Sequence, residues 1–157
     1  MKSKKLRFIL VLHNIRSRFN VGSIFRTADA AGVDKIYLCG ITPVPPHPKI
    51  SKVALGAEKF VPFEKISQTG KLLNKFRKEK IQITALEQSK KSIPYFRFKP
   101  KFPLALILGS ETKGLPFKIL KKCDKIIEIP MHGRKESLNV AVACGIVLFE
   151  VARYLYQ

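Results

Sequence analysis

The sequence contains only three cysteines, Cys39, Cys123 and Cys144, and no two of them have the CxxC spacing of a zinc or redox site. Neither a disulfide framework nor a structural metal site is therefore expected, and a reducing cytoplasm fits this cysteine usage. The first apolar run, residues 8–12, is too short for a signal peptide and lacks a small-residue cleavage site. The apolar helical stretch near the C-terminus is too short, and carries too many internal charges, for a membrane span. We expect a cytoplasmic protein that contacts neither a membrane nor a metal ion.

Acidic residues are also scarce. The chain has 11 Asp and Glu against 30 Lys and Arg, and its formal net charge of +19 indicates a polyanionic partner, RNA or DNA first. An anionic membrane surface is disfavoured because the basic residues are spread along the chain and do not lie on one amphipathic helix. Repeats and low-complexity segments are missing too, so the 157 residues predict a single globular domain (1–157) with a basic tail at residues 1–7.

Apolar runs of strand length alternate with stretches of helical periodicity along most of the chain. The expected strands are residues 8–12, 35–39, 60–62, 81–86, 103–108 and 125–129. The expected helices are residues 21–31, a small turn at 52–58, 64–79, 116–123 and 138–156. This order predicts an α/β fold with a mostly parallel sheet, right-handed crossovers and flanking helices.

Two segments between these elements have unusual compositions. Residues 40–49 contain four prolines and predict a long, stiff loop. Residues 92–102 interleave aromatic with basic side chains: Tyr95, Phe96, Phe98 and Phe102 with Arg97, Lys99 and Lys101. Such rings either stack on exposed bases or anchor the segment to the core, and we favour anchoring because buried rings are commoner.

The final helix is apolar nearly all round, and only Asn139, Glu150 and Arg153 are strongly polar. A helix of this kind is expected to be buried on more than one side. It is either a central core helix or a helix shared with a second subunit. A domain of this size has little interior in which to bury it, so we favour a homodimer interface.

Three stretches place Gly, Ser, Asn or Glu after predicted parallel strands, where ligands bind in open α/β sheets: residues 20–26, 109–114 and 129–139. Each also has a purely structural interpretation. Asn20 and Ser137 are candidate N-caps, and Glu111 suits a helix N-terminus.

Three familiar sites do not match these stretches. Gly109 and Gly114 have the GxxxxG spacing of a P-loop, but Leu115 and Pro116 replace the Lys and the Ser or Thr that bind phosphate and Mg²⁺. These stretches contain no GxGxxG motif, so dinucleotide binding is not indicated. Ser110 lacks the GxSxG elbow of a hydrolase, and the His residues lie in loops without an evident acidic partner.

Taken in order, the three stretches resemble the motifs of the SpoU/TrmH family of RNA 2′-O-methyltransferases, in the SPOUT superfamily. The matching residues are Asn20, Gly22, Ile24, Arg26, Thr27 and Ala28; Leu108, Gly109, Ser110, Glu111, Gly114 and Leu115; and Ile129, Pro130, Met131, Gly133, Ser137, Leu138, Asn139, Val140 and Ala143. The resemblance covers residues 8–155.

The resemblance implies a SPOUT-type α/β fold with a deep C-terminal trefoil knot, whose loops at residues 86–89, 109–115 and 129–138 hold S-adenosylmethionine. It also implies a homodimer in which each active site draws on both subunits. Many relatives carry an additional RNA-binding domain. We expect none here, so the basic surface itself would bind the RNA, either tRNA or rRNA.

The resemblance also implies roles for individual residues. The expected catalytic residues are Arg26, Asn20, Glu111, Ser137 and Asn139, and the expected cofactor-binding residues are Leu86, Gly109, Ile129, Met131 and Leu138. Arg26 is the residue assigned to activating the ribose hydroxyl. Because a guanidinium is rarely free to accept a proton, we expect it to stabilise the forming alkoxide and to position phosphate. The alternatives are a non-catalytic RNA-binding protein on the same scaffold and a SPOUT enzyme that methylates a base.

Overall fold

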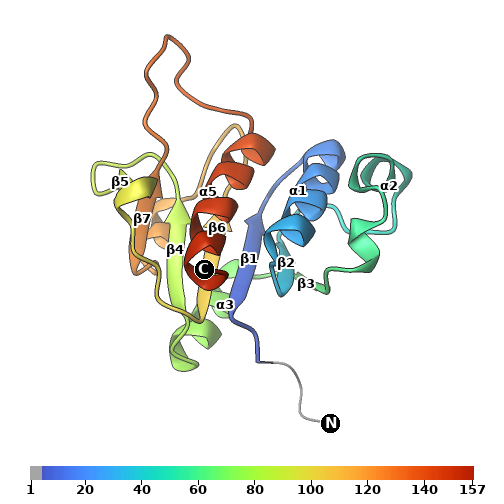
Figure 1. Cartoon of the computed structure of the whole chain (residues 1–157), viewed down its shortest axis with the longest axis horizontal. Helices are drawn as coiled ribbons and strands as arrows, with labels where there is room; N and C mark the ends of the chain where they lie inside the picture. Colours follow the sequence, from blue (N-terminus) through green and yellow to red (C-terminus); the bar gives the residue numbers. More distant parts are fainter. Residues whose placement is uncertain (1–4) are drawn as a thin grey trace.

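The computed structural model describes residues 5–157, and its centre is one seven-stranded sheet (Figure 1). The strands are β1 (Phe8–His13), β2 (Lys35–Cys39), β3 (Phe63–Ile66), β4 (Gln82–Leu86), β5 (Ile93–Pro94), β6 (Leu104–Leu108) and β7 (Lys125–Glu128). The helices are α1 (Arg18–Ala31), α2 (Pro48–Ala54), α3 (Thr69–Lys78), α4 (Phe117–Leu120) and α5 (Val140–Leu155), with short 3₁₀ turns η1 (Ala57–Lys59) and η2 (Tyr95–Arg97).

Every strand pairing is parallel, and the strand order is β3-β2-β1-β6-β4-β7-β5. The predicted mostly parallel sheet with flanking helices is therefore confirmed. The knot that the family resemblance implies stays a prediction.

The central strands are buried on both faces, which explains their continuous apolar runs. Along β1, Phe8, Leu10 and Leu12 face one core cluster, which also contains residues of α1, α2 and α5. Ile9 and Val11 face the other cluster, with residues of α3 and α4. The helices thus form one layer on each side of the sheet, and α1 and α5 lie side by side on the same face (Figure 1).

Both predicted N-caps are wrong, and in each case a neighbouring polar residue caps the helix. Helix α1 begins at Arg18, and the Ser17 hydroxyl accepts a hydrogen bond from the Asn20 backbone N–H at 3.1 Å. Helix α5 begins at Val140, and Asn139, not Ser137, is its cap. Asn20 therefore lies inside the first turn of α1, where its side chain can bond elsewhere.

The segment between β2 and β4 differs most from the sequence prediction. Residues 63–66 form β3, paired with β2, so the strand expected at 60–62 lies later and the helix expected at 64–79 begins only at Thr69. Pairing with β2, and the edge-on contact of Phe63 with Phe25, override the helical pattern. Helix α2 begins inside the predicted proline loop, because Pro48 suits a first helical turn and the His47 side chain caps it.

Most rings of residues 92–102 anchor this segment to the core, as we favoured. Phe98 is buried, and Tyr95 and Phe102 pack against the core formed with α1, α2 and α5. Phe96 differs, because 53% of it is exposed.

Helix α5 is covered on one face only in the single chain. Cys144 and Leu148 on that face are fully buried, whereas Val142, Ile146 and Phe149 are exposed by 53%, 36% and 52%. The single chain therefore buries only one side of α5. Across residues 5–157, no helix has the length and hydropathy needed to cross a bilayer.

Candidate functional site

A cavity of about 300 Å³ lies at the carboxyl ends of β4, β6 and β7. Its walls come from three loops: residues 86–88, 109–114 and the chain that leaves β7 and makes a long excursion before α5 (Figure 1). The five residues predicted to bind the cofactor all line it: Leu86, Gly109, Ile129, Met131 and Leu138. The predicted catalytic residues Glu111 and Ser137 line it too.

The loop after β6 folds tightly back on itself. Ser110 and Gly114 form an antiparallel bridge, and the Gly114 N–H donates to the Ser110 carbonyl oxygen at 2.9 Å. A Cβ on Gly109 would lie 2.5 Å from the carbonyl carbon of Gly114, so only glycine fits at position 109 without moving the backbone. The wall of the cavity therefore depends on this glycine.

Glu87 fastens this loop to the loop after β4. One oxygen of its carboxylate accepts a hydrogen bond from the Leu115 N–H at 2.8 Å, and the other accepts from the Gln88 N–H at 3.1 Å. The Gln88 side chain then donates to the backbone carbonyl oxygen of Glu136, in the third loop, at 2.7 Å. The three walls are thus tied together by hydrogen bonds within one chain.

The predicted cofactor loop at residues 86–89 includes Glu87 and Gln88, although only Leu86 of that loop was named as a binding residue. Both line the cavity, and both directly follow β4. Polar residues at the carboxyl end of a buried parallel strand were the available signal.

Three of the predicted catalytic residues form one hydrogen-bonded chain. The Asn20 side-chain amide donates to Glu111 Oε1 at 2.8 Å, and the Asn139 amide donates to Asn20 Oδ1 at 3.2 Å. Asn139 Oδ1 also accepts from the Ala141 and Val142 N–H groups at the start of α5. Asn139 is therefore both a helix cap and a member of the network, which links three segments far apart in the sequence.

Arg26 does not lie in this cavity. It is exposed on α1 and lines a separate groove between α1 and α5, with Ser23, Thr27 and Phe149 among its neighbours. The structure therefore brings four of the five predicted catalytic residues to the cavity or its rim, and leaves Arg26 on a different surface of the same chain.

The titratable groups of the core supply no reactive thiol. Burial raises the pKa of Cys39 to about 11 and that of Cys123 to about 12, and it also raises the pKa of the fully buried Cys144. All three thiols are therefore protonated near neutral pH, and a protonated thiol is a poor nucleophile. Between residues 5 and 157, no group of His, Cys, Asp and Glu side chains is arranged to hold a metal ion.

The lining of the cavity suits a ligand with both apolar and polar parts. Leu86, Leu108 and Leu138 supply apolar walls, whereas Ser110 and Glu128 supply polar groups. Its volume is at the lower end of the range for small-molecule sites, roughly 300–1,000 Å³. It can hold a nucleoside-sized molecule against the backbone of the glycine loop.

Comparisons with known proteins agree on one family. The model of the SpoU rRNA Methylase family matches residues 7–149. The chain is 33% identical over 153 residues to a 23S rRNA (guanosine-2′-O-)-methyltransferase of Yersinia pestis, and the match covers 98% of this chain and 62% of that protein. It spans between 58% and 63% of the length of the curated relatives compared with it.

Two solved structures show the same fold. The SpoU methyltransferase AviRb from Streptomyces viridochromogenes, in complex with the cofactor AdoMet, has a TM-score of 0.87 and 26% identity, and the match covers 96% of this chain and 61% of AviRb. A structure concerned with the 2-OH methylation of C/U34 on tRNA has a TM-score of 0.83 and 26% identity, with 94% of this chain and 95% of that chain covered.

Proposed function

The chain belongs to the SpoU rRNA methylase family, and from this premise we propose that it transfers a methyl group from S-adenosylmethionine to a ribose 2′-hydroxyl of structured RNA. The observation that carries the proposal is the convergence of three distant polar segments on one cavity, joined through Asn20, Glu111 and Asn139. The name of the Yersinia pestis relative and the cofactor held by AviRb support this chemistry. The net charge of +19 supports an RNA substrate, either tRNA or rRNA.

The cavity residues fit the proposed cofactor. Leu86, Ile129 and Leu138 would cover its apolar surfaces, and the backbone at Gly109 is open to close approach because no side chain lies there. When bound, S-adenosylmethionine supplies an electrophilic methyl group on a sulfonium, which becomes a neutral thioether once the 2′-oxygen has taken the methyl group. The chain itself then has to place the ribose oxygen in line and ease loss of its proton.

We assign these two tasks to the polar residues at the rim and to Arg26. Asn20, Glu111 and Asn139 hold one another by hydrogen bonds, so their side chains are ordered before RNA arrives. Ser137 lines the same cavity and is available to contact the ribose. Arg26 stabilises negative charge on the 2′-oxygen and positions phosphate, because a guanidinium is a permanent donor.

We further propose that the enzyme is a homodimer and that Arg26 of the partner subunit completes each site. Arg26 and the exposed Phe149 line the same groove, and Val142 and Ile146 extend this exposed apolar face along α5. A second copy placed on this face would bury the apolar side chains and bring Arg26 to an interface between subunits. Analytical ultracentrifugation of the wild type tests this: we expect a dimer at micromolar concentration, and a fully active monomer would contradict it.

Methyl transfer is tested by incubating the protein with labelled S-adenosylmethionine and separate pools of unmodified tRNA and rRNA. We expect label in one pool, and mass spectrometry of nuclease digests should place the methyl group on the 2′-oxygen. Gly109→Ala is the matched inactive variant, because its Cβ collides with the backbone that closes the cavity wall.

The same assay separates the alternatives. Methyl groups found on a base would identify a SPOUT base methyltransferase. RNA binding without methyl transfer, and without calorimetric binding of S-adenosylmethionine, would identify a non-catalytic RNA-binding protein.

A further inference from the structure

A second cavity, of about 270 Å³, lies on the other side of the loop formed by residues 109–114. We call it the flanking cavity. Ser110, Lys113 and Gly114 line both it and the cofactor cavity, so the two are separated by a single loop. The rest of its lining includes Asn14 and Arg16, from the segment that follows β1.

The flanking cavity occupies a position where open α/β sheets bind ligands. It lies outside the carboxyl ends of β1 and β6, which are neighbours in the sheet. From β1 the chain continues to β2 and β3 on one side, whereas β4, β5 and β7 lie on the other side of β6. Ligands of open α/β sheets bind at such a reversal of strand order. The proposed cofactor site accounts for the ends of β4, β6 and β7 and leaves this position unassigned.

The charge of the flanking cavity suits an anion. Arg16 and Lys113 are exposed and approach from different segments, and none of the described residues that line it is acidic. Arginine binds phosphate oxygens in a bidentate manner and lysine binds them as a point charge. Ile41, which is 62% exposed, and Pro116 provide apolar surface on the rim.

Its floor is held in place by hydrogen bonds. Asn14 adopts a left-handed backbone conformation with φ of 55°, and its Oδ1 accepts from the Ile41 N–H at 3.0 Å. Its amide nitrogen lies 3.3 Å from His13 Nε2, and His13 Nδ1 lies 2.7 Å from the Thr69 hydroxyl. One amide hydrogen of Asn14 can bond His13, which leaves the second to donate to a ligand.

We propose that the flanking cavity binds a backbone phosphate and the adjoining ribose of the substrate RNA, next to the nucleotide that receives the methyl group. The proposal rests on the proposed function, since it takes RNA as the substrate. Arg16 and Lys113 bind the phosphate oxygens, Asn14 donates to the sugar-phosphate backbone, and Ile41 contacts the sugar or base. Because one loop walls both cavities, RNA held here presents its neighbouring ribose to the cofactor cavity.

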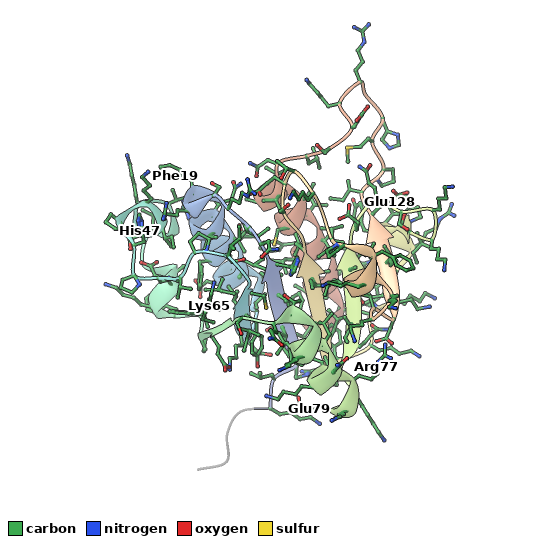
Figure 2. The ribbon with its side chains drawn as sticks, turned by 180° about the vertical axis from the view of Figure 1, so that it is seen from behind. Phe19, His47, Lys65, Arg77, Glu79 and Glu128 are labelled. Carbon is green, nitrogen blue, oxygen red and sulfur yellow. The ribbon has the colours of Figure 1, made fainter. Side chains whose placement is uncertain are left out.

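The test compares two double variants that remove the same charge. Arg16→Ala with Lys113→Ala empties the flanking cavity of its cations. Lys75→Ala with Lys78→Ala removes two exposed cations from the last turns of α3, whose end carries Arg77 and Glu79 on the opposite side of the molecule from the long loop (Figure 2). Binding of labelled tRNA transcripts and rRNA fragments is measured by fluorescence anisotropy over a series of salt concentrations, without cofactor.

For the flanking-cavity variant we expect RNA affinity to fall about 10-fold or more at physiological salt, and the slope of log K against log salt to decrease by about 1 to 2. The KM for RNA should rise in parallel, and by a larger factor than the Kd for S-adenosylmethionine, because Arg16 lines only the flanking cavity whereas Lys113 lines both cavities. The Lys75 and Lys78 variant should lose clearly less affinity. The charge-preserving double variant Arg16→Lys with Lys113→Arg should keep most of the RNA affinity. Its binding also shows that substitutions at these two positions leave the protein folded.

Equal losses in the two double variants, or an unchanged salt slope in the flanking-cavity variant, would overturn the proposal. If RNA affinity depends on Arg16 and Lys113 as expected but the wild-type protein transfers no methyl group, the proposed function is refuted and the phosphate site is still supported. A wild-type protein that binds neither RNA pool would overturn both.

Discussion

The cofactor cavity and the groove between α1 and α5 lie on one molecule but differ in how complete they are. Hydrogen bonds from Glu87 and Gln88 tie the loops that wall the cavity together within a single chain. The groove instead leaves Arg26 in solvent beside Phe149, a ring that is 52% exposed.

The difference teaches how the two halves of the reaction are divided. The three loops that line the cofactor cavity all come from one chain, so we expect a single chain to supply the binding groups for the methyl donor. Arg26, the cation that we propose for the acceptor hydroxyl, lies outside that cavity. We therefore expect cofactor binding and methyl transfer to respond to different substitutions.

The largest expected effect comes from Arg26→Ala. Loss of a donor that stabilises developing negative charge should lower kcat by about 10²- to 10³-fold. The Kd for S-adenosylmethionine, measured by calorimetry, should stay unchanged because Arg26 does not line the cavity. Arg18→Ala, an exposed arginine in the first turn of the same helix, is the control and should keep its kcat at saturating RNA. An active Arg26→Ala enzyme would refute the assignment.

Phe149→Glu should separate the subunits. A charge on this exposed apolar face of α5 is expected to weaken dimerisation by about 2 kcal/mol or more, roughly 30-fold in Kd. Phe117→Glu is the matched control, because Phe117 is 77% exposed but lies on α4, on the opposite face of the sheet. Sedimentation velocity should show dissociation only for Phe149→Glu, with methyl transfer falling as dimer is lost. Dissociation by the control alone would place the interface elsewhere.

Glu87→Gln tests whether the hydrogen bonds between loops position the wall of the cofactor cavity. The substitution removes the charge from the hydrogen bond to the Leu115 N–H, and bonds to charged groups contribute roughly 1.5–3 kcal/mol. We expect the Kd for S-adenosylmethionine to rise about 10-fold with the dimer intact. Glu79→Gln makes the same charge change far from the loops (Figure 2) and should leave the Kd unaltered. Equal affinity in both variants would show that Glu87 does not position the cavity wall.

His13→Gln has the smallest expected effect, and His13 lies at the end of β1 in the lining of the flanking cavity. Burial and the positive charge of Lys118 lower the pKa of His13 from its ordinary value of 6.5. As the pH is lowered through 6.5, the unfolded chain takes up a proton before the folded chain does. The free energy of unfolding therefore decreases as the pH decreases, until the lowered pKa of the folded chain is passed. Urea denaturation at several pH values should show a smaller loss on acidification for His13→Gln. A parallel loss in both proteins would contradict this.

The sequence predicted the parallel sheet because buried strands have a local signature. Phe8 to Leu12 and Leu104 to Leu108 are continuous apolar runs, and each became a strand buried on both faces. Residues 63–66 lack such a run, and their strand forms only through pairing with β2. An edge strand of this kind has little local signal.

The polar residues show why the site was found only in part. The family motifs named Asn20, Glu111 and Asn139, but both caps were misassigned because Ser and Asn serve equally well at N-caps. Asn139 caps α5 and bonds Asn20, a contact across 119 positions that no local pattern reveals. Glu87 lay in a predicted cofactor loop, but its bond to Leu115, which is 28 positions away, could not be predicted for the same reason.

The most direct test of a site shared between subunits is to mix two inactive variants. Arg26→Ala keeps its cofactor cavity, and Gly109→Ala keeps its Arg26. Mixed dimers should contain one complete site, so an equal mixture that exchanges subunits should recover about a quarter of wild-type methyl transfer. Recovery near that level is the result we expect. A mixture that stays inactive, although mixed dimers form and the wild type is active, would contradict the division of the site between two chains.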